Sequence, residues 1–178
     1  MRSMPKRRAC FKTPCLAAVL SALALSAGCS RDSGALKTYL MGERAEAGTL
    51  IYTVIEAEWF ERIGQNPSPR FPKNRFLALR VNITNSGAAE ATIPLMTLVD
   101  PSGRAYEEET SGEGVPQWLG MLRKVKAAET DEGRVIFDVP RGDYHLRVAD
   151  DGFEPEKAKA VLIQIPLRFE SGSSGLPK

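Results

Sequence analysis

The clearest pattern along the chain is an alternation of aliphatic and other side chains within residues 75–85. Here Leu77, Leu79, Val81 and Ile83 alternate with Ala78, Arg80, Asn82 and Thr84. A period of two places the aliphatic side chains on one face of a β-strand and the others on the opposite face. The segment therefore predicts a half-buried antiparallel strand, which Asn85-Ser86-Gly87 ends with residues that favour a turn.

Other segments carry weaker versions of the same signal. Residues 50–60 are rich in β-branched and aromatic residues, and residues 134–139 place Val135, Phe137 and Val139 on one face before Pro140 blocks further pairing. Asp100-Pro101-Ser102-Gly103 has the residue order of a type I turn and predicts a hairpin between residues 95–99 and 104–107. The remaining predicted strands are residues 144–149 and 160–167.

One segment is ambiguous, because the apolar residues of 118–128 also fit a helical stripe. Gly120 interrupts it and its neighbours are strands, which favours a strand or an irregular edge over a helix. About seven short strands separated by turns predict an all-β fold, an immunoglobulin-like antiparallel β-sandwich. Two connections are long, residues 62–74 with three prolines and residues 107–117 with four acidic residues.

The amino terminus predicts export. Residues 1–15 hold five Arg and Lys with no acidic residue, and residues 16–25 contain only Leu, Ala, Val and Ser. This apolar run is shorter than the roughly 20 residues that cross a bilayer, so residues 1–28 are interpreted as a signal peptide. Leu25-Ser26-Ala27-Gly28-Cys29 resembles the lipobox of bacterial lipoproteins, with Ser26 where an aliphatic residue is usual. The resemblance implies cleavage before Cys29 and its lipidation with diacylglycerol and an acyl chain such as palmitate, which together anchor a protein stably.

Processing changes the charge and the cysteine count. The signal removes five cationic residues, so 24 Lys and Arg against 22 Asp and Glu become 19 against 22, a net charge of −3. This charge gives no reason to expect a nucleic-acid partner. The mature chain keeps only Cys29, which leaves no intramolecular disulfide. We expect a tether at residues 29–40, one sandwich domain at 41–169 and a flexible tail at 170–178.

Several segments together resemble a bacterial family classed as domain of unknown function 4352, whose members are secreted or lipid-anchored. The matching segments are residues 41–43, 48–54, 76–87, 98–106 and 133–140, in this order. The resemblance implies an immunoglobulin-like sandwich. It carries over no catalytic or binding residue, because the matching residues are those of strands and turns.

The chain has few candidate residues for a catalytic or soft-metal site. The only histidine, His145, lies in a predicted strand, and lipidation would remove the Cys29 thiol, so no nucleophile and base pair is indicated. Met96, Met121 and His145 are too scattered for a soft-metal site. The sequence therefore predicts no catalytic residue, no metal ligand and no cofactor, and leaves the ligand-binding residues unknown.

The sequence favours a non-enzymatic binding or accessory module, held on a membrane by lipid, that contacts another envelope protein or a ligand. Trp59 is expected in the core and Trp118 is expected to be a surface anchor. Two alternatives stay open: an envelope hydrolase with paired carboxylates, and a calcium-dependent adhesion domain using Glu107, Glu108, Glu109 and Glu113, or Asp150 and Asp151. Ser30 after the lipidated cysteine would favour the outer membrane in a host with two membranes, and the cell membrane applies in a host with one.

Overall fold

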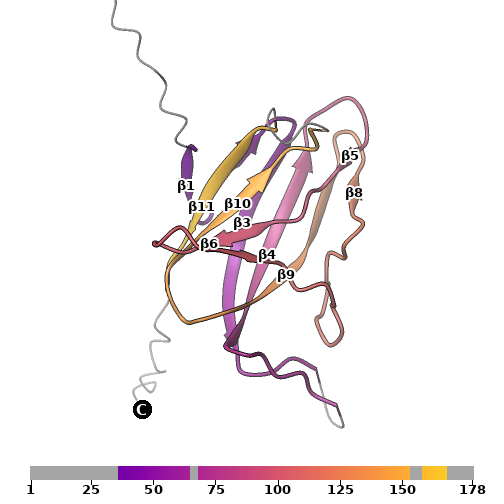
Figure 1. The fold of residues 1–178 in the computed structure, drawn as a ribbon. Coiled ribbons are helices and arrows are strands. Elements are labelled where there is room, and N and C mark those ends of the chain that lie inside the picture. Colours follow the sequence, from indigo (N-terminus) through magenta and orange to yellow (C-terminus); the bar gives the residue numbers. More distant parts are fainter. Residues whose placement is uncertain (1–35, 65–67, 153–157, 168–178) are drawn as a thin grey trace, which may run out of the picture. The chain divides into compact units, whose positions relative to one another are not determined.

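The computed structural model describes residues 36–64, 68–152 and 158–167, which lie within one compact unit, Gly34–Lys178. The described residues form eleven β-strands in two facing sheets and a short ribbon (Figure 1). Among them, no helix is long and apolar enough to cross a bilayer. The strands are β1 (Thr38–Leu40), β2 (Ala45–Ala47), β3 (Leu50–Phe60), β4 (Arg75–Asn85), β5 (Ala91–Thr92), β6 (Thr97–Val99), β7 (Ala105–Glu107), β8 (Lys124–Val125), β9 (Thr130–Val139), β10 (Tyr144–Ala149) and β11 (Ala160–Ile165).

The four-stranded sheet has the order β2-β3-β4-β9 and is antiparallel throughout. Along β4 the odd-numbered aliphatic side chains are fully buried against the other sheet, whereas Arg80 and Asn82 are half-buried on the opposite face. We call this opposite face, which carries Ala78 and Arg80 on β4, the outer face. The alternation that predicts the strand thus also assigns its two faces correctly.

The five-stranded sheet has the order β1-β11-β10-β6-β7. Strand β1 pairs with β11 in parallel, and the other pairs are antiparallel. Strands β6 and β7 form the predicted hairpin, closed by a 2.9 Å hydrogen bond from Gly103 N to Asp100 O. The ribbon of β5 and β8 forms a separate pair.

The main core lies between the two sheets. It contains aliphatic side chains from both, among them Leu79 of β4 and Leu146 of β10, each fully buried. The Tyr52 hydroxyl of β3 crosses the core and donates a 2.7 Å hydrogen bond to the carbonyl of Ala149 at the end of β10. Burial raises the pKa of Tyr52 well above its usual value, so the phenol stays neutral as a donor.

The structure confirms the all-β sandwich and the absence of a helix from residues 118–128, where the chain is irregular apart from β8. The two sheets contain nine strands instead of about seven, because short pieces such as β1 and β2 pair with longer neighbours. Thr38–Leu40, expected in the tether, is instead strand β1, since Thr38 pairs with Leu162 across the sheet. The predicted signal peptide, Cys29 and the tail at 170–178 lie outside the described residues.

Candidate functional site

The two long connections predicted from the sequence contact each other over the outer face of the four-stranded sheet. The β3–β4 connection contributes Arg70, and the β7–β8 connection contributes Glu109 and Ser111. The Arg70 Nη2 atom lies 3.0 Å from Glu109 Oε2, and Nη1 donates to the Ser111 carbonyl at 2.7 Å. One arginine therefore joins both loops.

A glycine contact brings the two loops closer still. Gly64 and Gly114 have φ angles of +86° and +77°, a region that favours glycine. A Cβ atom added to Gly114 would lie 2.5 Å from the Gly64 Cα atom, which is too close for any side chain. The backbones can approach this closely only because Gly114 lacks a side chain, whereas a Cβ atom on Gly64 would lie at an ordinary 3.8 Å from the Gly114 Cα atom.

The β7–β8 loop is also fastened to strand β9. The amide of Glu109 donates to the Ile136 carbonyl at 2.8 Å, and Leu119 N donates to the Arg134 carbonyl at 3.1 Å. The Arg134 amide in turn donates to the Gln117 carbonyl at 2.8 Å. Residues 109–119 are therefore held at both ends along β9 and lie over the outer face of the sheet. We call this segment the roof.

A cleft of about 280 Å³ lies between this roof and the sheet. Its floor is the cross-strand row Glu58, Ala78 and Ile136, in which Ala78 pairs with both neighbours. A methyl group at the centre of the row leaves space that a longer side chain would fill. Its apolar walls are Phe60 of β3, Ile63 of the β3–β4 loop, and Val115 and Pro116 of the β7–β8 loop.

Charged side chains line one part of the same cleft, namely Arg62, Arg134 and Glu58. The nearest acidic contact of Arg134 is Glu56, at 3.8 Å. Its Nη1 atom makes two long hydrogen bonds of 3.4 Å, to the Pro116 carbonyl and to Gln117 Oε1. The cleft thus combines an apolar floor and walls with two arginines and one glutamate.

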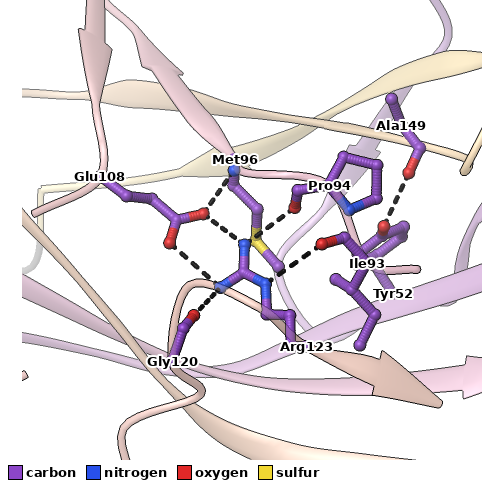
Figure 2. Close-up of polar contacts among 8 residues, drawn as sticks. All are labelled: Tyr52, Ile93, Pro94, Met96, Glu108, Gly120, Arg123 and Ala149. Atoms are coloured by element: carbon purple, nitrogen blue, oxygen red, sulfur yellow. Dashed lines mark hydrogen bonds and ion pairs between the residues drawn. The ribbon is translucent and has the colours of Figure 1, made fainter. Parts of the chain in front are cut away.

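A buried ion pair holds the far end of the β7–β8 loop (Figure 2). The Arg123 guanidinium contacts Glu108 through Nη2–Oε1 at 2.6 Å and Nη1–Oε2 at 3.1 Å, and both side chains are 1% exposed. Arg123 also donates to the carbonyls of Pro94, Ile93 and Gly120, and the Met96 amide donates to Glu108. Each of the three guanidinium nitrogens of Arg123 donates to an acceptor. The pair therefore holds the loop in place and does not offer a free charge to a ligand.

The acidic residues proposed for calcium do not come together. Glu108 is paired with Arg123 and Glu109 with Arg70, so two of the four carboxylates in this loop are occupied by cations. Asp150 accepts the amide of Lys159 at 3.0 Å at the end of β10. Within the described residues, no three His, Cys, Asp or Glu side chains are grouped so as to hold a metal ion.

The other residues singled out from the sequence are dispersed. His145 lies in β10, opposite Val99 of β6. Trp59 packs against the main core, as expected, with its ring 6.4 Å from that of Tyr144. Trp118 is half-buried, and a Cβ atom added to Gly112 would lie 1.9 Å from its ring. The ring packs on the Gly112 backbone inside the loop, and its expected role as a surface anchor stays a prediction.

Sequence reasoning identified the two loops but missed the cleft. In the sequence, Ala78 is only one position on the polar face of a predicted strand. The residues that cover it in the structure are distant in sequence. The one available signal was an alanine in a row of longer outer-face side chains, such as Arg80 and Asn82.

Solved structures with similar folds come from bacteria. The yjhA protein of Bacillus subtilis is 17% identical, with a TM-score of 0.56, and the match covers 71% of this chain and 98% of that one. A candidate lipoprotein of Bacillus subtilis, ycdA, is 15% identical with a TM-score of 0.57, over 71% of this chain but only 39% of that chain. A functionally unknown protein of Listeria monocytogenes is 12% identical with a TM-score of 0.50, over 71% and 82%. At these identities the similarity shows the fold alone.

No curated protein matches the sequence. The family model described as "Domain of unknown function (DUF4352)" matches residues 39–158, which extend from β1 to the segment before β11. The match includes both long loops and all the described residues that line the cleft. The chain therefore belongs to the DUF4352 family.

Proposed function

We propose that the chain is an exported bacterial lipoprotein, anchored to a membrane through Cys29, whose β-sandwich domain binds a ligand or an envelope partner without catalysing a reaction. The anchor rests on the sequence: a cationic segment, a short apolar run and small residues before Cys29. The description of the structurally similar ycdA as a candidate lipoprotein supports it.

The observation that carries the binding role is the preformed cleft. Four separate contacts hold the β7–β8 loop over the sheet: the Arg70 bridge, the Gly64–Gly114 contact and the backbone pairings of Glu109 and Leu119 with β9. A cleft with fixed walls binds without first ordering its loops, which lowers the entropic cost of association. Apolar walls with a few polar groups are typical of ligand sites.

The contents of the cleft favour binding over hydrolysis. A glycosidase mechanism requires two carboxyl groups facing one bond. Among the described residues that line the cleft, Glu58 is the one carboxylate. His145, on β10 of the other sheet, is not among the lining residues.

The anchor is tested by metabolic labelling with an alkyne analogue of palmitate in a bacterial host. The wild-type chain should take up the label and sediment with membranes. The Cys29→Ala variant should do neither, while keeping the same melting temperature, because Cys29 precedes the residues of the β-sandwich in the sequence. Equal labelling of both forms would refute the lipoprotein assignment.

The binding role is tested with a substitution that fills the cleft, Ala78→Leu. Native envelope is cross-linked to the lipidated chain, and small molecules are screened separately by thermal shift. A ligand or partner of the cleft should no longer bind to Ala78→Leu but should still bind to Asn82→Leu. The second substitution adds bulk on the same face of β4, four residues further along the strand. If the lipidated chain turned over a substrate from a panel of glycans, esters and peptides, the non-enzymatic assignment would be wrong.

A further inference from the structure

We propose that the cleft binds a small apolar group that ends in a single carboxylate, such as an aromatic or aliphatic residue with a free carboxyl terminus. This inference rests on the proposed binding function and specifies the chemistry of its ligand. It is carried by the size of the cleft, by its apolar walls and by the charge of the arginines that line it.

The size of the cleft limits the apolar part of the ligand. A volume of about 280 Å³ lies just below the range of about 300–1,000 Å³ that is typical of small-molecule sites. The space above Ala78 is therefore suited to one side chain or one ring. Ile136 below it, and Ile63 and Val115 beside it, would contact such a group with apolar surface.

The charge of the arginines indicates the polar part. In the β3–β4 connection and β4, Arg70, Arg75 and Arg80 each have a carboxylate oxygen within 3.1 Å of a guanidinium nitrogen. Arg134 reaches a carboxylate only at 3.8 Å, and no described acidic residue forms an ion pair with Arg62. Neither arginine that lines the cleft therefore has a close carboxylate, which leaves both guanidinium groups able to bind the carboxylate of a ligand.

The remaining charge in the cleft favours a monoanion. Among the residues that line the cleft, Arg62 and Arg134 carry two positive charges and Glu58 carries one negative charge. Glu56, 3.8 Å from Arg134, is paired more closely with Arg80 at 3.1 Å. A carboxylate matches the resulting single positive charge and accepts two hydrogen bonds from a guanidinium. A phosphate dianion would bring a second negative charge toward Glu58, which repels it.

The test uses the full lipidated chain in nanodiscs and ¹⁹F NMR titrations of two probes. These are N-acetyl-4-fluorophenylalanine, which carries a carboxylate, and its neutral primary amide. The acid should bind at least about tenfold more tightly than the amide, since a hydrogen bond between charged groups is worth about that factor. Empty nanodiscs measure the partition of each probe into lipid.

Variants assign the binding to the cleft. Ala78→Leu should abolish binding of the acid, whereas Asn82→Leu should leave it unchanged. Arg134→Gln should lower affinity for the acid to that for the amide without affecting the amide. Because Arg134→Gln keeps the backbone pairing and empties no core, it tests the inference even if Ala78→Leu folds poorly.

Competition then identifies the source of the carboxylate. The tripeptide Gly-Gly-Phe with a free carboxyl terminus and 3-phenylpropionate are compared as competitors of the fluorinated acid. Stronger competition by the tripeptide supports the carboxyl terminus of a protein, and stronger competition by 3-phenylpropionate supports a free acid; both agree with the inference.

Two results would overturn the inference in distinguishable ways. If acid and amide bind equally and Ala78→Leu abolishes both, the carboxylate is wrong but the cleft remains a binding site, as the proposed function requires. If neither probe binds, or if Ala78→Leu has no effect, the assignment of this ligand to the cleft fails.

Discussion

At the scale of single residues, the Glu108–Arg123 pair is the most deeply buried ion pair among the described residues, with both side chains 1% exposed. Removing one partner leaves the other buried without a counter-charge, which costs about 3–5 kcal/mol in comparable sites. We expect Glu108→Ala and Arg123→Met each to lower the free energy of unfolding by about this amount. The double variant should cost much less than the sum, because it leaves neither charge unpaired.

Urea denaturation of the four proteins measures this coupling. Lys124→Met, next to Arg123 but paired with Glu90 on the surface, serves as the control and should change stability by less than about 1 kcal/mol. Additive losses in the double variant would show that the two buried side chains act independently.

Asp100 gives the hairpin between β6 and β7 a dependence on pH. Its carboxylate accepts the Ser102 hydroxyl at 2.6 Å and the amides of Ser102 and Arg104, each at 2.9 Å. The hydroxyl bond contributes most to lowering the pKa of Asp100 below its ordinary value. Stability from such a group is present above the unfolded pKa of about 3.9 and is lost as pH falls through the lower folded pKa.

The resulting prediction concerns Asp100→Ala. The difference in melting temperature between wild type and this variant should be largest near pH 7 and should shrink below about pH 3. Asp100→Asn cannot ionise, so its difference from Asp100→Ala should stay constant across the same range. A wild-type difference that does not change between pH 7 and pH 2.5 would contradict the linkage.

The burial of Glu108 could not be predicted from the sequence. In the sequence the run Glu107-Glu108-Glu109 is a candidate set of calcium ligands, yet Glu108 is buried in the structure. Nothing near it in sequence indicates this, because its partner Arg123 is 15 residues away and meets it only in the fold.

At the scale of elements, Arg70 couples the two loops over the cleft. The Arg70–Glu109 pair is partly exposed, so Arg70→Ala should cost no more than about 1 kcal/mol in global stability. The Arg70→Ala substitution should nevertheless speed hydrogen exchange at the Glu109 and Leu119 amides. It removes the bonds through which the β3–β4 loop holds the β7–β8 loop. Arg75→Ala is the matched control, since its partner Glu61 lies in the same β3–β4 connection. Equal exchange in both variants would show that β9 alone holds the roof.

The long strands were predictable, and the short ones were not. Strands β3, β4 and β10 coincide with the segments predicted from their side-chain patterns, because one buried face decides each of them. Strands such as β1 and β5 have two or three residues and exist only because a distant partner lies beside them. The same holds for the cleft, because the two loops that border it are joined by a hydrogen bond between Arg70 and Ser111, 41 positions apart in the sequence.

At the scale of the whole molecule, strand β1 determines how far the domain can lie from its proposed anchor. Thr38 pairs with Leu162 and so belongs to the folded sheet, nine residues after Cys29 in the sequence. A fully extended chain spans at most about 3.3–3.6 Å per residue, so Thr38 can lie no more than about 30 Å from the lipidated cysteine. The proposed lipid anchor would therefore keep this edge of the domain close to the membrane surface.

This limit predicts efficient energy transfer from the domain to the bilayer. In the proposed mature lipoprotein the Cys29 thiol would be blocked by lipid, so Thr38→Cys would introduce a uniquely reactive exposed site for a donor dye. In vesicles with acceptor dyes on the lipid headgroups, transfer should be strong. It should weaken when a long Gly/Ser linker is inserted after Ser30, because the coil lengthens with the square root of its residues. Strong transfer that the linker leaves unchanged would indicate that the domain itself contacts the membrane, in which case the bilayer, and not the tether alone, would position the cleft.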